Sequence, residues 1–260
     1  MNTKQVVPAL VAVTFLSLIP ASEALALQQN ATAPKAASAP QPGKTGDDIK
    51  RAEDKNATAP AAVRTDEAAP SVSDAQKAYD AGSYEEAFII VEPLAKMNHP
   101  EAEYLLGQMY ELGRGVKKDS EKALSLFTAA ANQGYAAAQA KLGSLHVEGK
   151  QDYASAMNWF QKAADQGYAL AYSAIGDLYA KGYGVDKNQD KAVEYYKKAA
   201  EAGDAAACLR LGRMYEQGEG VKADREEAAT WYKKGADLGC TECAAALKNL
   251  EQKPSSQPSQ

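Results

Sequence analysis

The chain has 260 residues, of which 45% are hydrophobic and 24% are charged. A chain of this size can bury one core, and with only 4 phenylalanines that core is expected to consist of closely packed helices. The net charge of −5 excludes the basic surface of a typical nucleic-acid-binding protein, and no basic run indicates docking on an anionic membrane.

The first 26 residues have the pattern of a signal peptide. Lys4 supplies a positive charge, residues 6–19 are apolar, and Ala24 and Ala26 are the small residues that a signal peptidase reads. The alternative is a membrane anchor, but the apolar stretch is short and polar residues follow it directly. We therefore expect a periplasmic or secreted protein, cleaved after Ala26, with no membrane anchor after cleavage.

Residues 27–72 are predicted to form a disordered linker rich in alanine and proline. Such a segment has too few large apolar side chains to offset the entropy of ordering, and its prolines keep it extended. The string NATAP occurs at residues 30–34 and again at 56–60, and both copies contain an N-x-T sequon. The linker is therefore either an unmodified spacer or a glycosylated one.

Internal repetition is the strongest signal in the sequence. A glycine-containing motif begins at residues 105, 141, 174 and 210, where the chain reads LLGQMYELGRGV, KLGSLHVEG, AIGDLYAKGYGV and RLGRMYEQGEGV. Each copy is followed by a second helical pattern that ends in a glycine. The period is about 36 residues, but the second unit has about 33 because its G-x-G-V loop is missing.

The first helix of each unit has one apolar face, formed in the first unit by Ala102, Leu106 and Tyr110 at four-residue steps. A glycine inside this helix costs roughly 1 kcal/mol relative to alanine. We therefore expect a neighbouring helix backbone to approach closely at these glycines, which are Gly107, Gly143, Gly176 and Gly212. Each first helix is predicted to end at a left-handed glycine, and these residues are Gly113, Gly149, Gly182 and Gly218.

The second helix begins with an N-cap residue in every unit, because a side chain that can accept hydrogen bonds from the first-turn amides precedes it. These residues are Asp119, Asp152, Asn188 and Asp224. An aromatic column follows, made of Phe127, Phe160, Tyr196 and Tyr232. The valines of the G-x-G-V loops are expected to tuck each loop under the core, and they are Val116, Val185 and Val221.

Two partial units flank the repeats. Residues 73–98 are predicted to form an N-terminal capping hairpin, in which Ser83 and Glu86 make a capping box and Asn98 takes the place of the terminal glycine. Pro93 is expected to kink its second helix. Residues 240–252 are predicted to form a C-terminal capping helix, followed by a disordered tail at residues 253–260.

Taken together, these columns resemble the Sel1-like repeat family, which is related to the tetratricopeptide repeat. The shared pattern is A-x-x-x-LG-x-x-Y-x-x-G-x-GV-x-x-D-x-x-K-A, and it covers residues 99–134, 135–167, 168–203 and 204–239. The resemblance implies an all-α fold, a right-handed α/α superhelical solenoid of stacked helix hairpins. The sequence departs from the pattern at the missing loop and at His146, where the family usually has tyrosine.

No residue constellation indicates catalysis, a cofactor or a metal. His99 opens the first unit and His146 lies in a packed column, so both are expected to be structural. The chain has no nucleophile elbow, phosphate-binding glycine loop or histidine–carboxylate cluster with metal-ligand spacing. We therefore expect a protein that is not an enzyme and that needs no cofactor.

All 3 cysteines lie near the C-terminal end, and disulfides persist in an exported protein. In the repeat register Cys243 matches Ala207, which places it beside Cys208 on the next stacked helix. This register favours a Cys208–Cys243 disulfide. The alternatives are a local disulfide between Cys240 and Cys243 or, in the same C-x-x-C segment, a redox pair.

The resemblance also implies a function, because Sel1-like and tetratricopeptide solenoids bind protein partners with a concave groove lined by the first helices. The matching positions are Tyr104, Gln108, Glu111, Ser144, Val147, Ser173, Asp177, Lys181, Arg213, Glu216 and Gln217. We therefore expect a scaffold that binds a protein or peptide partner and no nucleic acid.

An alternative follows from the cysteine-rich members of the same family, which are linked to β-lactam binding and hydrolysis. It would make the chain a protein that binds β-lactams or peptidoglycan, or a hydrolase. Those members carry a cysteine pair in each repeat, whereas the first three full units of this chain contain no cysteine.

Overall fold

Within residues 70–252, which the computed structural model describes, every regular element is an α-helix. In chain order the helices are α2 (Val72–Asp80), α3 (Tyr84–Lys96), α4 (Pro100–Leu112), α5 (Ser120–Asn132), α6 (Ala136–Lys150), α7 (Tyr153–Ala164), α8 (Ala169–Lys181), α9 (Gln189–Glu201), α10 (Ala205–Gln217), α11 (Arg225–Asp237) and α12 (Thr241–Gln252). None of these helices is both long and apolar enough to cross a membrane. The predicted signal peptide, residues 27–69 of the linker and the tail at 253–260 lie outside the described residues.

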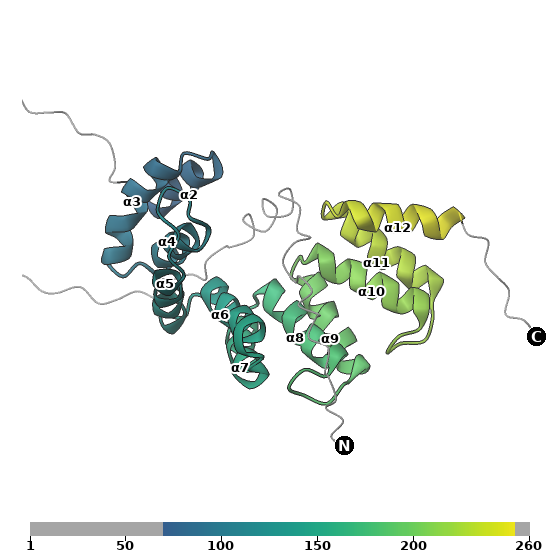
Figure 1. Ribbon diagram of the computed structural model, residues 1–260. Helices are drawn as coiled ribbons and strands as arrows, with labels where there is room; N and C mark the ends of the chain where they lie inside the picture. Colours follow the sequence, from purple (N-terminus) through teal and green to yellow (C-terminus); the bar gives the residue numbers. More distant parts are fainter. Residues whose placement is uncertain (1–69, 253–260) are drawn as a thin grey trace, which may run out of the picture.

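Each helix packs mainly on its neighbours in the chain, so that α2/α3, α4/α5, α6/α7, α8/α9 and α10/α11 form successive hairpins. The hairpins follow one another in a curved row that ends at α12 (Figure 1). This arrangement confirms the predicted all-α solenoid, and it means that each hairpin is stabilised by its own packing and by the adjacent units.

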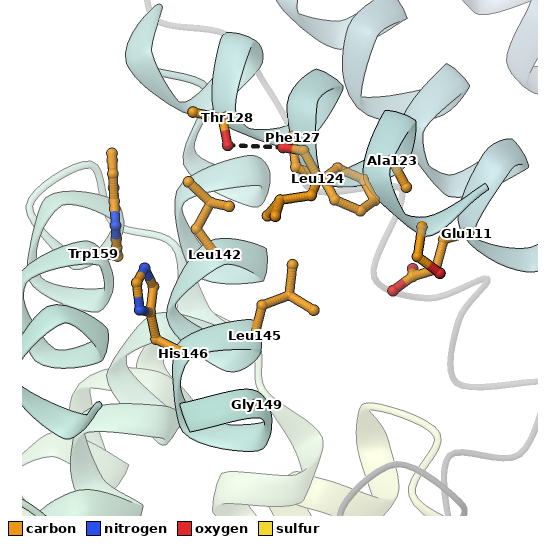
Figure 2. A pocket seen from close by; sticks show the side chains of 11 residues that line it. Glu111, Ala123, Leu124, Phe127, Thr128, Leu142, Leu145, His146, Gly149 and Trp159 are labelled. Carbon is orange, nitrogen blue, oxygen red and sulfur yellow. Dashed lines mark hydrogen bonds between the residues drawn. The ribbon is translucent and has the colours of Figure 1, made fainter. Parts of the chain in front are cut away.

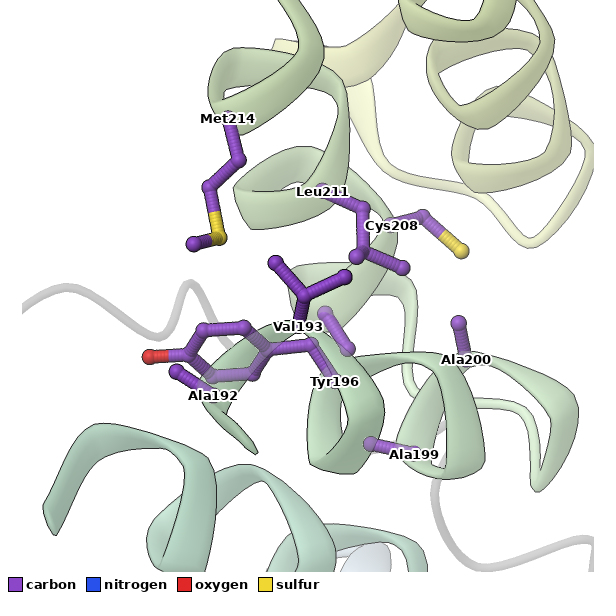
Figure 3. Packing of buried hydrophobic residues seen from close by; sticks show 9 residues of the cluster. Ala192, Val193, Tyr196, Ala199, Ala200, Cys208, Leu211 and Met214 are labelled. Carbon is purple, nitrogen blue, oxygen red and sulfur yellow. The ribbon is translucent and has the colours of Figure 1, made fainter. Parts of the chain in front are cut away.

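Small side chains let the helices approach closely. The alanine columns of both helices are buried, and their members are Ala102, Ala138, Ala171 and Ala207 in the first helices and Ala123, Ala156, Ala192 and Ala228 in the second. Between α9 and α10 the larger residues Val193, Tyr196, Leu211 and Met214 fill the remaining space (Figure 3). The thin core predicted from the scarcity of phenylalanine is therefore built from alanine and single aromatic rings.

We expected the glycines inside the first helices to face the backbone of a neighbouring helix, and this prediction is wrong. They face the aromatic ring of the second helix in the same unit. A Cβ added at Gly107 would lie 2.7 Å from Cε1 of Phe127, and one at Gly176 would lie 2.7 Å from Cε1 of Tyr196. The same pairs recur as Gly143 with Phe160 and Gly212 with Tyr232. Each glycine therefore makes a hollow that a ring fills.

The predicted helix ends hold in three of the four units. Gly113, Gly182 and Gly218 are left-handed, with φ of 70°, 72° and 76°. The prediction for Gly149 is wrong, because α6 continues to Lys150 and Gln151 takes the left-handed conformation, with φ of 51°. With the G-x-G-V loop absent, two further helical residues span the shorter distance to α7.

The second-helix caps are confirmed, since Asp119, Asp152, Asn188 and Asp224 each accept a first-turn amide hydrogen bond. The capping box at Ser83 and Glu86 is wrong, because the Ser83 side chain makes no capping bond. Asp152 caps α7 from a similar backbone conformation, so the longer aspartate reaches an amide that the shorter serine does not. In the same hairpin Ser71 and Asp74 form a capping box at the start of α2.

Residues at the unit boundaries differ in chemistry although they occupy the same register. Tyr104 and Tyr135 pack edge to face, with ring centroids 5.3 Å apart. At the next boundary Tyr168 packs on the buried cluster that contains Ala140. At the one after that, the Ser173 hydroxyl donates a hydrogen bond to the Asp204 carboxylate, and both residues are buried.

The expected Cys208–Cys243 disulfide is not formed. Cys243 is bonded to Cys240, and Cys208 remains a buried thiol. Cys208 and Cys243 nevertheless lie close together, as the repeat register predicted, because both pack against Gly235. However, Cys240 and Cys243 flank the first turn of α12 with their Cα atoms 5.2 Å apart, which suits a disulfide, and a cysteine can form only one.

Candidate partner-binding surfaces

Several side chains predicted to line the groove are held in place by neighbours. Tyr104 contacts Phe127 and Tyr135, and its hydroxyl accepts a hydrogen bond from Gln108 at 3.3 Å. Burial is the main cause that raises the pKa of Tyr104. Burial likewise raises the pKa of Tyr168, to about 12. These tyrosines therefore stay neutral and act as apolar packing groups at physiological pH.

Ion pairs join successive first helices at two boundaries. Glu111 of α4 lies 2.8 Å from Nζ of Lys141 on α6, and Asp177 of α8 lies 3.3 Å from Nε of Arg210 on α10. Asp177 also accepts a hydrogen bond from the Tyr196 hydroxyl at 2.6 Å. Asp177 is therefore a structural group as well as a surface charge, so its replacement would disturb packing as well as recognition.

Ser173 does not fit the groove prediction, because its side chain is only 6% exposed and bonds the buried Asp204. Ser144 and Val147 are partly buried, and the Ser144 hydroxyl donates to the Ala140 carbonyl at 3.3 Å. The middle of the predicted surface is therefore small and weakly polar.

Among the predicted groove residues, the exposed ones lie in the C-terminal units. Lys181, Arg213, Glu216 and Gln217 are exposed. Glu216 accepts a hydrogen bond from the Tyr232 hydroxyl at 2.9 Å, and partial burial is the main cause that lowers the pKa of Lys181. We call Lys181, Arg213, Glu216 and Gln217 the polar surface.

A second surface is a pocket of about 540 Å³ between α5, α6 and α7. Figure 2 shows His146 and Trp159 on one side of it and Leu124 and Phe127 on the other. Its remaining wall is formed by Glu111, Ser120, Ala123, Thr128, Leu142, Leu145 and Gly149. We call it the α5–α6 pocket. The pocket was not predicted from the sequence, although the missing G-x-G-V loop after α6 indicated that a surface there would be uncovered.

The described residues offer no arrangement that indicates catalysis or metal binding. Within residues 70–252 no group of three histidine, cysteine, aspartate or glutamate side chains could hold a metal ion. His146 lies with Nδ1 3.5 Å from Oδ2 of Asp152, beside the pocket. His99 precedes α4 in an extended conformation.

The fold and these surfaces define the class of the protein, an α-solenoid of stacked helix hairpins. The Sel1 repeat profile matches residues 100–135, 136–168, 169–204 and 205–240. Because the matches cover more than half of the chain, it belongs to the Sel1 repeat family.

Solved structures agree with this assignment. A Sel1 repeat protein from Oxalobacter formigenes is 35% identical with a TM-score of 0.64, and the match covers 72% of this chain and 84% of that one. A protective antigen present in uropathogenic Escherichia coli strains is 32% identical with a TM-score of 0.60, covering 70% of this chain and 41% of the antigen. A comparison with curated protein sequences finds no match.

Proposed function

We propose that the chain is an exported scaffold that binds a polypeptide partner along the outward side chains of its first helices. Sel1-repeat proteins generally bind protein partners, which supports the class of function. The polar surface is the observation that carries the assignment to these helices. Its Lys181 lies close to the ion pair of Asp177 and Arg210, and Asp177 is held by a hydrogen bond from the Tyr196 hydroxyl.

Fixed charges favour selective binding, because little side-chain entropy is lost when a partner docks on groups that are already held. The exposed Lys181 and Arg213 lie near Arg210, so basic groups outnumber the acidic Asp177 and Glu216 on this part of α8 and α10. A partner segment that carries carboxylates is the complement of this surface.

Photo-crosslinking tests the proposal. A photoreactive residue at Gln217 is expected to capture a partner in the native cell envelope, and reversing the charges at Lys181 and Arg213 should reduce the yield at least tenfold. The matched control reverses Lys187 and Lys233, which are exposed outside the first helices. If a photoreactive residue placed at Lys233 forms crosslinks and one placed at Gln217 does not, the second helices form the binding face instead.

Export is part of the proposal, and one mass measurement tests it together with the cysteine chemistry. Protein from the envelope fraction, alkylated under denaturing conditions, is expected to begin at Leu27 and to carry one alkyl group, on Cys208. Without denaturant alkylation should be slow, since burial raises the pKa of Cys208 to about 11. A mass that begins at Met1 would refute cleavage after Ala26, and an alkyl group on Cys240 would refute the local disulfide.

A further inference from the structure

The α5–α6 pocket lies where the G-x-G-V loop of the second repeat would lie if that loop were present. In the other units the G-x-G-V loop packs on the start of the preceding second helix. Gly115 lies against Tyr84 of α3, Gly184 against Tyr153 of α7, and Gly220 against Gln189 of α9. By register the loop of the second repeat would cover Ser120 at the start of α5, and Ser120 lines the pocket.

The exposure of the second-helix residues follows the presence of the loop. Leu124 is 49% exposed, whereas Val193 in the same column is 5% exposed. Phe88 and Met157 occupy this column in the other covered units and are partly buried. Leu124 is thus the member of the column that lacks its cover.

The three complete loops show what chemistry covers such a surface. Val116, Val185 and Val221 each pack against a buried cluster, whereas no loop valine packs on the cluster around Phe127. The residue between the two glycines adds a contact in two of these units. Arg114 lies over the Tyr84 ring at 5.3 Å, and Tyr183 stacks on Tyr153 with centroids 5.0 Å apart.

We propose that the α5–α6 pocket receives, from a partner polypeptide, a segment with a glycine followed by a valine- or leucine-sized side chain. The same interface is formed three times within the chain, so the occupant repeats an established mode of packing. Leu124, Leu142, Leu145 and Trp159 would surround its aliphatic side chain. This inference deepens the proposed function by giving the chemistry of one partner contact, and it does not depend on the polar surface.

Filling the pocket from within the chain is one test. Insertion of Arg-Gly-Val between Gly149 and Lys150 restores the loop length, and the matched control inserts Arg-Gly-Asp. Because the valine variant buries an aliphatic side chain, its Tm should exceed that of the control by about 3–6 °C. Hydrogen exchange at residues 120–124 should also slow at least tenfold relative to the control.

A peptide titration tests binding in trans. Trp159 becomes the single tryptophan when Trp231 is replaced by phenylalanine, and it lines the pocket. The peptide LGRGVKKD has the sequence of residues 112–119 of this chain. It should change the fluorescence of Trp159 and saturate with a Kd below about 5 mM, which corresponds to a binding free energy of about 3 kcal/mol. Replacing its valine by aspartate, or replacing Leu124→Asp in the protein, should weaken binding at least tenfold.

Each of the following results would overturn the inference. They are equal binding of the two peptides, a titration that does not saturate by about 5 mM, and equal Tm values for the two insertion variants. A binding free energy of about 3 kcal/mol would give saturation in that range. Protection of residues 120–124 in the natural chain without peptide that equals the protection in the Arg-Gly-Val variant would show that the chain covers the pocket itself, and it would also overturn binding in trans. Charge reversal at Lys181 and Arg213 should leave the peptide titration unchanged. The crosslinking experiment can therefore contradict the proposed function while the titration still supports the pocket, and the reverse.

Discussion

Replacement Gly176→Ala is expected to lower the free energy of unfolding by about 1–3 kcal/mol, although alanine is the better helix former. The added Cβ would lie 2.7 Å from Cε1 of Tyr196, a distance that requires the ring or the helix to move. The Tyr196 side chain is only 4% exposed and its hydroxyl bonds Asp177, so the ring has no free space into which it could rotate. Urea unfolding followed by circular dichroism would measure the change.

Two controls separate crowding from helix propensity. Gly149 lies in α6 with nothing within 4 Å of an added Cβ, so Gly149→Ala should gain up to about 1 kcal/mol. In a Tyr196→Leu background the ring is absent, and Gly176→Ala should then cost much less than in the natural chain. A Gly176→Ala protein that is as stabilised as Gly149→Ala would contradict the assigned role of the ring.

Replacement Asp204→Ala should cost about 2–4 kcal/mol, because it removes two interactions in a buried position. Asp204 caps α10 through the Ala206 amide at 2.9 Å and also accepts the Ser173 hydroxyl. The side chain is 3% exposed, so water cannot replace the lost acceptor easily. Asp204→Asn keeps an acceptor for Ala206 and a donor for Ser173, and it should cost less than half as much.

A double replacement provides a sharper control. Ser173→Ala with Asp204→Tyr copies the boundary that Ala140 and Tyr168 form one unit earlier. It should recover most of the stability that Asp204→Tyr loses alone, measured by thermal unfolding. If the single and double variants unfold at the same temperature, the Ser173–Asp204 contact does not set the stability of this boundary.

The repeat columns made most of the fold predictable. Apolar residues at four-residue steps, an N-cap before each second helix and a glycine after it are local signals, and they placed the helices within a few residues. Gly149 was misplaced because its role depends on the loop that follows. Where that loop is absent, helix α6 extends and Gln151 ends it.

Contacts between elements were harder to predict. The columns of Gly176 and Tyr196 are both visible in the sequence, but only the crossing of the two helices brings the ring over the glycine. The pocket has the same origin, since the surface uncovered by the short loop after α6 belongs to α5, more than twenty residues earlier in the chain. The cysteine register located Cys208 and Cys243 together but could not account for the closer Cys240.

The varied unit boundaries bear on how near-identical hairpins find their order during folding. A chain of similar repeats can stack one hairpin against the wrong neighbour, as repeat proteins do when they misfold. Here such an exchange would bury the Asp204 carboxylate against an alanine or a tyrosine ring instead of the Ser173 hydroxyl. The unpaired buried charge would penalise that misassembled state strongly, so the boundary residues select the correct sequence of hairpins as well as holding them together.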